Sequence, residues 1–421
     1  MRVYVESFGC SQNQGEGAGI ARDLSARGHE LARDPSRADV GILVTCGVIG
    51  PTESRMVRRW QALSSRVPRV VVTGCLVPLR CDLMRGPGRE RTTFVPIREQ
   101  AHLPALLDAW APDAPVIPAA PVPEPELPPL PVTEEVVIAQ GCTSGCSYCF
   151  SRLARGRLTS VPVSEVVRRV RSATRRGVRE IRLTGLDTAA WGEDLPGPER
   201  LPELLRAVES LPGDFSVRVG MMSPQSLEPR LDDYLEALSA GRAYRFLHLP
   251  LQSGSDRVLE AMRRGYRADQ FRRQVEEARR RIPDLHLATD VIVGFPGETE
   301  EDFRATEELL EAVGPETVNV TRFSPRPGTP AAHLPPLPPR VAKRRSRSVA
   351  ALRLRLARSR LERWIGARTV GRVIEHGPGS SSVARLANYL PVVLDRRIPL
   401  GSDVELRIDG ARSTYLLGTA A

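Results

Sequence analysis

"EVVIAQGCTSGCSYCF", residues 135–150, joins an apolar strand pattern to three closely spaced cysteines. Cys142, Cys146 and Cys149 follow the strand in a C-x3-C-x2-C arrangement, and no fourth cysteine or histidine lies within the next fifty residues. A structural zinc site closes its coordination with four ligands, whereas three thiolates on a [4Fe–4S] cube leave one iron open. The stretch therefore predicts a cluster with a coordination position left for a small chelating molecule.

Strand and helix patterns alternate around this stretch, giving six βα units between residues 133 and 335. The strand patterns are EVVIAQ, REIRLTG, FSVRVG, RFLHLP, LHLATDVIVGF and TVNVTRF, and helical patterns cover 163–176, 201–210, 227–239, 267–281 and 299–313. Such alternation predicts a parallel sheet, and six units fall short of the eight that close a barrel. We expect an α/β fold with a central partial (βα)6 barrel, whose open side admits a bulky substrate.

Residues 1–111 show the same alternation on a smaller scale. RVYVES, DVGILVT and RVVVT are strand patterns, with helices expected at 16–28 and 52–66. Cys10, Cys46 and Cys75 each lie just past the carboxyl end of one of these strands, where open parallel sheets form ligand sites. We predict an N-terminal parallel α/β domain in which these three thiols converge on a second cluster, and we interpret Cys81 as a spare thiol.

Two proline-rich stretches separate these parts from the remainder. Nine prolines predict an extended linker over 112–132, and seven more occur between 325 and 340. Residues 336–363 are expected to form a basic helix, since 340–363 holds ten Lys or Arg and one acid. The last segment, 364–421, has short strand patterns and glycine-rich turns, which predicts a small antiparallel β-barrel of the oligonucleotide-binding sort.

Composition narrows the class of protein further. The 421 residues carry a formal net charge of +10 and seven cysteines, and they include no apolar run long enough to cross a membrane. An odd number of cysteines without a secretion signal favours metal ligation in a reducing compartment over disulfides. We therefore expect a cytoplasmic protein with no membrane contact, and the basic stripe at 340–363 is a candidate surface for nucleic-acid phosphates.

These motifs together resemble the radical S-adenosylmethionine methylthiotransferases. The cysteine loop, with Tyr148 before its third cysteine, is similar to the superfamily's cluster loop, and FGCSQN, VTCGV and TGCLVP are similar to the three N-terminal cysteine motifs of the methylthiotransferases. Five further stretches resemble the branch of the family that acts on N6-threonylcarbamoyladenosine in tRNA. They are LTGLDTAAWG, RVGMMSPQSL, FLHLPLQSGSDRVLEAMRRGY, ATDVIVGFPGETEEDF and RFSPRPGTPAA. The ending NYLPVVL…GSDVELRI…TYLLG resembles the tRNA-binding barrel called TRAM, so the resemblance covers essentially the whole chain.

The resemblance implies cofactors and partners. It implies two [4Fe–4S] clusters, one on Cys10, Cys46 and Cys75 and one on Cys142, Cys146 and Cys149, with S-adenosylmethionine chelated by the second. One S-adenosylmethionine would methylate a sulfur carried by the first cluster. Another would be cleaved to a radical that removes hydrogen from C2 of the modified adenine, which then takes the methylthio group. The implied partners are tRNA, bound at its anticodon loop, an external one-electron donor and a sulfur donor, and we expect a monomer.

Further site residues are expected from the resemblance and from their positions at strand ends. Cofactor contacts are expected of Tyr148, Asp187, Arg218, Gln252, Ser253 and Asp290. RNA contacts are expected of Arg326, Arg344, Arg345 and Asn388, and Arg155 is expected to contact a cluster or a phosphate. No catalytic side chain is assigned beyond the cluster ligands.

Alternatives stay open. Thr45 before Cys46, LVPLRC after Cys75 and a glycine within SQNQGEGAG depart from the family pattern around the N-terminal thiols. The same fold also serves modification of isopentenyladenosine in tRNA or of an aspartate in a ribosomal protein, and a non-catalytic tRNA-binding metal protein is a further alternative. Residues 364–421 carry seven arginines against five acids, which favours RNA over a basic ribosomal protein.

Overall fold

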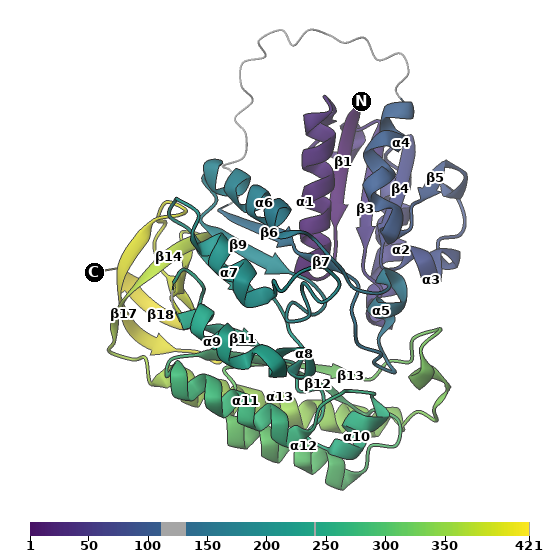
Figure 1. Cartoon of the computed structure of the whole chain (residues 1–421). Coiled ribbons are helices and arrows are strands. Elements are labelled where there is room, and N and C mark those ends of the chain that lie inside the picture. The colour runs from purple at the N-terminus through teal and green to yellow at the C-terminus, as the bar shows by residue number, and fades with distance from the viewer. Residues whose placement is uncertain (111–131, 240, 421) are drawn as a thin grey trace.

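The computed structural model describes residues 1–110, 132–239 and 241–420. Figure 1 shows an N-terminal sheet with its helices, a central curved array of strands and helices, and a C-terminal barrel beside the first strands of that array. The predicted proline-rich linker, apart from Val132, lies outside the described residues.

The N-terminal part is a five-stranded sheet in the order β2-β1-β3-β4-β5, with all pairs parallel. Its strands are β1 (Arg2–Ser7), β2 (Glu30–Leu31), β3 (Val40–Thr45), β4 (Arg69–Gly74) and β5 (Thr92–Phe94). All six residues of β3 are buried, as expected for a central strand covered on both faces. Ile42 and Val44 pack with α1 (Ser11–Ala26) and α4 (Leu103–Ala109), whereas Leu43 packs with α2 (Gly50–Ser64).

The central part contains the six predicted strands as two three-stranded parallel sheets, β10-β9-β6 and β11-β12-β13. The strands are β6 (Thr133–Val137), β9 (Glu180–Thr184), β10 (Ser216–Val219), β11 (Phe246–His248), β12 (His286–Val293) and β13 (Thr317–Arg322). An isolated parallel bridge between Val217 and Ala243 connects the two sheets. The array is therefore an open, partial barrel, as predicted.

Helices cover the outside of this barrel and share one continuous apolar core with its strands. They are α6 (Val163–Arg175), α7 (Leu201–Glu209), α9 (Leu231–Ser239), α11 (Ala268–Arg281) and α12 (Glu300–Val313), each within a few residues of its predicted range. The predicted basic helix is present as α13 (Pro339–Glu362), which lies alongside α12 in Figure 1. Short helices α3 (Val77–Arg80), α5 (Phe150–Arg155), α8 (Pro224–Leu227) and α10 (Asp256–Ala261) lie between the main elements.

The C-terminal part is a closed five-stranded barrel in the order β14-β15-β16-β18-β17. Its strands are β14 (Arg368–His376), β15 (Ser382–Leu386), β16 (Pro391–Leu394), β17 (Asp403–Ala411) and β18 (Leu416–Ala420). The barrel was predicted to be antiparallel, but β16 and β18 pair in parallel. The barrel is mixed because β17, which separates β16 from β18 along the chain, lies on the other side of β18 and pairs antiparallel with both β14 and β18.

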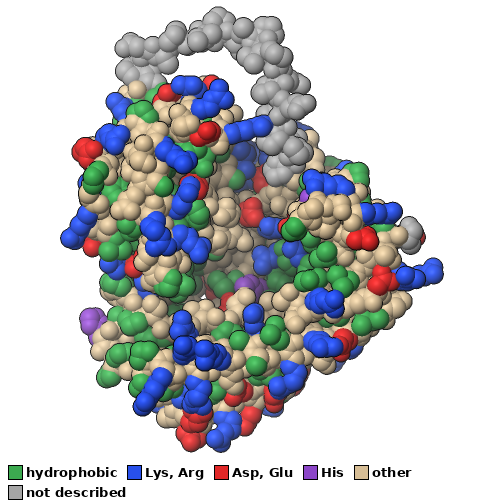
Figure 2. Space-filling model, turned by 180° about the vertical axis from the view of Figure 1, so that it is seen from behind, with side chains coloured by type: hydrophobic (Ala, Val, Ile, Leu, Met, Phe, Trp, Pro, Cys, Tyr) green, Lys and Arg blue, Asp and Glu red, His purple; other side chains and the backbone are tan. Residues whose placement is uncertain are grey.

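Glycine permits the close contact between the N-terminal part and the barrel. A Cβ on Gly15 of α1 would lie 3.0 Å from the Cβ of Glu135 and 3.1 Å from its carbonyl oxygen, on β6. A larger residue would therefore push α1 away from the barrel's first strand. Seen from behind, the molecule is hollowed at its centre, between the N-terminal part and the remainder (Figure 2).

Candidate active site

The loop that carries three cysteines is fixed at its base and at its far side. β7 (Ala139–Gln140) and β8 (Thr159–Ser160) pair antiparallel and close the base, a pairing the sequence did not indicate. Gly141 has a φ of +69°, and a Cβ there would lie 1.9 Å from the carbonyl oxygen of Arg157, so only glycine fits. Ser147 Oγ donates to the carbonyl of Ala261 at 2.8 Å, which holds the loop to α10. The three thiols are thus presented by constrained backbone.

Each sulfur of this loop accepts a hydrogen bond. The N–H of Ser144 donates to Cys142 Sγ at 3.3 Å, and the N–H of Arg152 donates to Cys149 Sγ at 3.3 Å, where Cys149 is the N-cap of α5. Arg264 Nη1 donates to Cys146 Sγ at 3.1 Å. Burial raises the pKa of the free Cys149 thiol to about 12 and also raises that of Cys142. Donors aimed at sulfur suit thiolates whose negative charge is stabilised by a bound cluster.

The three N-terminal cysteines come together at the carboxyl edge of their sheet, as predicted. Cys10 is the N-cap of α1, and Cys46 and Cys75 directly follow β3 and β4. A Cβ on Gly9 would lie 3.0 Å from Cys46 Sγ, and the N–H of Cys75 donates to the carbonyl of Thr45 at 3.0 Å, so the three loops are in contact. Burial raises the pKa of Cys75 to about 12 and also raises that of Cys46.

The thiols of both sets fit iron–sulfur clusters better than single metal ions. Within residues 1–110, 132–239 and 241–420, no three His, Cys, Asp or Glu side chains gather tightly enough to hold one ion. A cube places each thiolate on its own iron atom, so its ligands stand farther apart than those around one ion. Cys46 and Cys75 are buried, the three thiols of the 142–149 loop are half-buried and Cys10 is exposed. N–H groups donate to Cys75 and to each thiol of the loop, and such donors suit the thiolate ligands of a cube.

A pocket of about 220 Å³ lies between the two cysteine loops. Val48 and Ile49, which follow Cys46, form one wall, and Tyr148 and Cys149 belong to another. The rest of the lining comes from the second sheet and the segment after it: Gln252, Asp290, Val291, Ile292, Thr321, Arg322, Phe323, Ser324 and Arg326, with Phe150 and Ser151 from α5. The pocket therefore borders Cys149 and the segment that follows Cys46.

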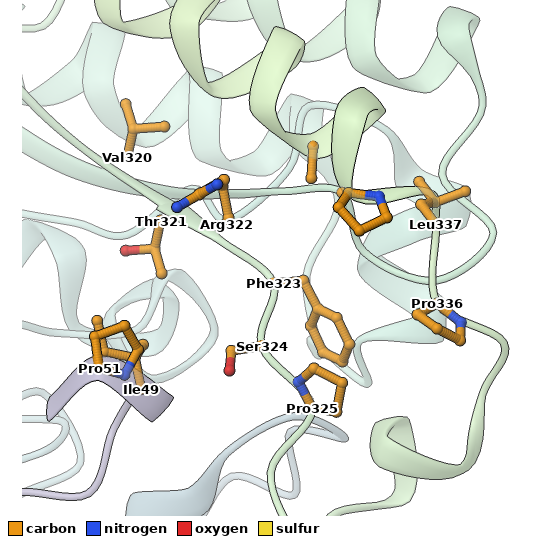
Figure 3. A pocket seen from close by; sticks show the side chains of 13 residues that line it. Ile49, Pro51, Val320, Thr321, Arg322, Phe323, Ser324, Pro325, Pro336 and Leu337 are labelled. Carbon is orange, nitrogen blue, oxygen red and sulfur yellow. The ribbon is translucent and has the colours of Figure 1, made fainter. Parts of the chain in front are cut away.

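A larger pocket of about 480 Å³ adjoins the first and shares the wall formed by 321–324. Figure 3 shows Ile49 and Pro51 of the N-terminal part on one side, Pro336 and Leu337 on the other, and the chain from Val320 to Pro325 between them. Its lining is mostly apolar, with Arg322 as its charged side chain. The two pockets also share Ile49, which follows Cys46 by three residues.

Three residues predicted to bind a cofactor line the smaller pocket: Tyr148, Gln252 and Asp290. Gln252 has a positive φ of 65°, and its buried Oε1 accepts no hydrogen bond from any described residue. Burial alone would raise the pKa of Asp290, but hydrogen bonds from His248 Nε2 at 3.0 Å and Asn319 Nδ2 at 2.7 Å hold it below its ordinary value. These three side chains line the pocket, and their contact with a cofactor stays a prediction.

The other three predicted cofactor residues do not line the pocket. Asp187 is buried and accepts hydrogen bonds from Ser223 N–H and Ser226 Oγ, at 2.9 and 2.7 Å, at the start of α8. Ser253 Oγ lies 3.4 Å from Thr306 Oγ1, on the α12 side of the strand end. Arg218 stacks over the rings of Phe246 and Tyr389, next to the C-terminal barrel. Serine and threonine groups bind Asp187 and Ser253, whereas Arg218 makes ring contacts and its buried Nε has no partner among the described residues. Cofactor contacts of these three residues stay a prediction.

Three of the four residues predicted to contact RNA are buried and the fourth is exposed, and their contacts with RNA stay a prediction. Arg345 is 3% exposed and pairs with Glu298 at 2.6 Å, and Asn388 is 2% exposed and donates to the carbonyl of Asp284 at 3.1 Å. Arg326 is 4% exposed, pairs with Glu53 and stacks over Phe150, so it forms part of the pocket wall. Arg344 is exposed, but Glu300 binds its guanidinium at 3.0 and 2.7 Å. The sequence pattern predicted the basic helix but not the acidic side chains with which its arginines pair.

Several site residues were not predicted. Arg264, His248 and Asn319 come from separate elements and contact Cys146 or Asp290 only in the folded chain. Arg322 lies within the predicted TVNVTRF strand pattern and is the last residue of β13, so the strand-end signal that selected Asp290 also marks it. Arg155 does contact a cysteine, as predicted, but Nε donates to Cys75 of the N-terminal set, at 3.2 Å, and not to its own loop. That choice of partner had no signal in the sequence.

Comparison with known proteins agrees with this architecture. The Radical SAM superfamily model matches residues 136–310, and the model of the uncharacterized protein family UPF0004 matches residues 2–86. The probable threonylcarbamoyladenosine tRNA methylthiotransferase of Pyrococcus abyssi is 37% identical over 428 residues, covering 99% of each chain. The chain belongs to this methylthiotransferase family. The human threonylcarbamoyladenosine tRNA methylthiotransferase is 33% identical over 359 residues, which cover 83% of this chain and 62% of the human protein.

Solved structures support the fold. A radical S-adenosylmethionine methyltransferase, TsrM from Kitasatospora setae, with cobalamin and a [4Fe–4S] cluster bound, superimposes with a TM-score of 0.55 at 15% identity, covering 79% of this chain and 76% of that one. At this identity the similarity concerns the fold alone. Membership of the Radical SAM superfamily implies a [4Fe–4S] cluster and S-adenosylmethionine for this radical tRNA methylthiotransferase. In the part of the chain that the structure describes, no helix has the length and apolarity to cross a membrane.

Proposed function

We propose that this enzyme adds a methylthio group to C2 of N6-threonylcarbamoyladenosine in the anticodon loop of tRNA, with two [4Fe–4S] clusters and S-adenosylmethionine as cofactors. The observation that carries the proposal is the pocket whose walls include both the segment after Cys46 and the segment around Cys149. A substrate base in that pocket has one cysteine set on each side. The names of near full-length relatives support the choice of nucleoside.

The donor sets divide the chemistry between them. When bound, the cluster of Cys142, Cys146 and Cys149 supplies one-electron cleavage of S-adenosylmethionine, and the cluster of Cys10, Cys46 and Cys75 supplies the methylthio group. The pocket holds the base between them, which turns separate encounters into one effectively unimolecular step. Gln252 offers an unpartnered amide oxygen to a donor on the cofactor or the base, and Asp290 stays ionised to accept another hydrogen bond.

The pocket's size and aromatic groups suit an extruded base. Tyr148, Phe150 and Phe323 supply ring faces and edges on which an adenine stacks once it leaves the loop. Its mainly apolar walls exclude water, which protects a reactive radical from side reactions. The adjoining pocket then accommodates the substituent on N6 of the adenine.

Arg322 favours threonylcarbamoyladenosine over isopentenyladenosine. It lines both pockets, and its guanidinium makes no ion pair or hydrogen bond with any described residue. The threonylcarbamoyl group ends in a carboxylate, which an arginine binds in a charge-assisted, bidentate manner. The isopentenyl group has no charge to offer it. An unpaired cation in the substrate path is thus matched to the acidic substituent.

Partners outside the chain complete the proposal. The net charge of +10 favours a nucleic-acid substrate and makes its binding sensitive to salt. An external one-electron donor reduces the radical cluster, a sulfur donor replenishes the other, and the enzyme acts as a monomer.

The proposal is tested with protein loaded with iron and sulfide under anaerobic conditions, reductant, S-adenosylmethionine and tRNA containing threonylcarbamoyladenosine. Mass spectrometry of digested tRNA detects the methylthio nucleoside, and chromatography detects 5′-deoxyadenosine. We expect Cys142→Ala to lose both products and Cys46→Ala to keep 5′-deoxyadenosine formation while losing methylthio transfer. Methylthio transfer by Cys46→Ala would exclude the proposed division of roles. Loaded wild-type protein that binds tRNA but forms neither product would favour a non-catalytic binding protein.

A further inference from the structure

The helix α5 connects the two cysteine sets through its two ends. It begins at its N-cap Cys149, a member of the radical set, and ends at Arg155. Arg155 Nε donates to Cys75 Sγ, a member of the N-terminal set, at 3.2 Å. One short, rigid helix therefore joins a ligand of one set to a hydrogen-bond donor for the other.

The Arg155 guanidinium is completely enclosed and fully hydrogen-bonded. Its side chain is 0% exposed, and Nη1 donates to Glu16 Oε1 and to Gln140 Oε1, the latter at 2.6 Å. Nη2 donates to Asn13 Oδ1 at 2.6 Å and to Glu16 Oε2 at 3.0 Å. With the bond to Cys75, these contacts use the five N–H groups of an arginine. The planar fork is locked in one orientation, which a lysine ammonium could not reproduce.

The same network braces the other two N-terminal cysteines. Asn13, which accepts from Arg155, donates through Nδ2 to the carbonyls of Phe8 and Thr45, at 2.7 and 2.9 Å. These carbonyls belong to the loops that lead into Cys10 and Cys46. Arg155 thus acts on Cys75 directly and on the loops of Cys10 and Cys46 through Asn13.

The charges of Arg155 and its partner Glu16 also bear on the reduction potential of a cluster at Cys75. Glu16 carries the compensating negative charge, on α1, and its side chain is 4% exposed. Hydrogen bonds to cluster sulfurs and nearby positive charge raise the reduction potential of iron–sulfur clusters, and nearby negative charge lowers it. The Arg155–Glu16 pair therefore places two opposing influences next to Cys75.

We propose that Arg155 is a positioning residue that fixes the N-terminal cluster relative to the radical-domain helix and, through its Nε–H···Sγ bond, raises that cluster's reduction potential. The inference rests on the proposed function in one respect, the presence of a cluster on Cys10, Cys46 and Cys75. It predicts that methylthio transfer becomes uncoupled from S-adenosylmethionine cleavage when Arg155 is changed. Glu16 acts on the same cluster in the opposite electrostatic sense.

The test isolates the N-terminal cluster in the full-length chain by changing Cys142, Cys146 and Cys149 to alanine. A redox titration followed by electron paramagnetic resonance then gives its midpoint potential. Arg155→Gln leaves Glu16 uncompensated, so the potential is expected to fall. Glu16→Gln leaves the guanidinium uncompensated, so the potential is expected to rise. Arg345→Gln, which breaks a buried ion pair with Glu298 on a different part of the barrel, is the control and leaves the potential unchanged.

In chains with all cysteines present, we expect Arg155→Gln to lower the ratio of methylthio nucleoside to 5′-deoxyadenosine about tenfold. A change of that size corresponds to the loss of roughly one charge-assisted hydrogen bond. Unchanged midpoint potentials in both variants, or shifts of the same sign, would overturn the inference. The potentials are measured without tRNA, so a wrong nucleoside assignment does not affect them. A wild-type chain that binds iron through only one cysteine set would overturn the inference together with the two-cluster proposal.

Discussion

Gln252 combines two unusual features at the pocket wall: a left-handed backbone with φ of 65° and a buried amide oxygen without a partner in the described chain. Its backbone is held there because its N–H donates to the carbonyl of Asp290 and its own carbonyl accepts from Ile292, at 2.8 and 3.0 Å. A non-glycine residue in this conformation costs about 1–2 kcal/mol. Strain and an unsatisfied acceptor at one residue indicate that it is shaped by a ligand rather than by folding alone.

Changing Gln252 to glycine should therefore affect stability and binding in opposite directions. Glycine relieves the backbone strain, so the free energy of unfolding without cofactor is expected to rise by up to about 1 kcal/mol. Loss of the amide is expected to weaken S-adenosylmethionine binding or substrate binding severalfold. Urea denaturation and equilibrium binding measure the two effects. A variant that is less stable and binds normally would contradict the assigned role.

Arg322 is expected to set substrate selectivity through its charge. Arg322→Gln should lower kcat/KM for tRNA containing threonylcarbamoyladenosine by about 10- to 100-fold. This factor corresponds to the free energy of a charge-assisted hydrogen bond to a carboxylate. The control is Arg304→Gln, an exposed arginine on α12 that lines neither pocket. Equal kinetics for the two variants would show that Arg322 does not bind the substituent.

At the scale of elements, the arginines of α13 have partners that the sequence pattern did not indicate. Its arginines were predicted to bind phosphates, but many pair inward: Arg345 with Glu298, Arg344 with Glu300, Arg355 with Glu311 and Arg360 with Glu316. The acids belong to α12, to the turn before it and to the segment after it. These four pairs attach α13 to the partial barrel.

Arg345→Ala should destabilise the protein without weakening RNA binding. Removing one partner leaves Glu298 buried and unpaired, which costs about 3–5 kcal/mol in the free energy of unfolding. The neighbouring Arg344→Ala removes an exposed pair and should cost about 1 kcal/mol or less. Urea denaturation gives both values, and filter binding gives the Kd for tRNA. A much weaker Kd for folded Arg345→Ala would restore the predicted RNA contact.

The elements and the positions of the cysteines at strand ends could be predicted from the sequence, whereas side-chain partners could not. The strands and helices follow from apolar periodicity, and Cys10, Cys46 and Cys75 follow from the rule that parallel strands end at one edge. Arg155 and Cys75 are eighty residues apart, and their bond depends on how α5 faces the N-terminal sheet. The parallel pairing of β16 with β18 depends likewise on barrel closure, which short strand patterns do not determine.

At the scale of the whole molecule, the C-terminal barrel docks through the turn between β15 and β16. Tyr389 there packs against Tyr244 and Phe246 at ring distances of 5.0 and 4.9 Å, and the N–H of Arg245 donates to the carbonyl of Ala387 at 2.9 Å. His286 lies beneath this contact, with its ring 5.2 Å from Phe246. The barrel is therefore joined to the partial barrel by a packed aromatic cluster.

His286 should make this junction sensitive to acid. Burial, together with the positive charge of Arg385, lowers its pKa to about 3 in the folded protein. Below pH 6.5 the unfolded chain binds a proton that the folded chain does not, so stability falls as the pH drops from 6.5 towards 3 and is unaffected above that range. Between pH 7 and pH 5 the loss from this group is about 2 kcal/mol.

Urea denaturation at pH 7 and pH 5 tests this prediction. The His286→Gln variant should lose less stability than wild type over that interval, because it has no ring to protonate. His333→Gln, at an exposed histidine, should behave as wild type. Identical pH dependence in all three proteins would contradict the role of His286.

The most direct test of the central claim is a competition between two tRNA substrates in one reaction. Fully loaded enzyme, reductant, S-adenosylmethionine and sulfide are mixed with equal amounts of tRNA containing threonylcarbamoyladenosine and tRNA containing isopentenyladenosine, and mass spectrometry of the nucleosides reads both products. The account predicts a methylthio group on threonylcarbamoyladenosine, formed together with 5′-deoxyadenosine, and none on isopentenyladenosine. A methylthio group found mainly on isopentenyladenosine, or 5′-deoxyadenosine formed without either product, would contradict it.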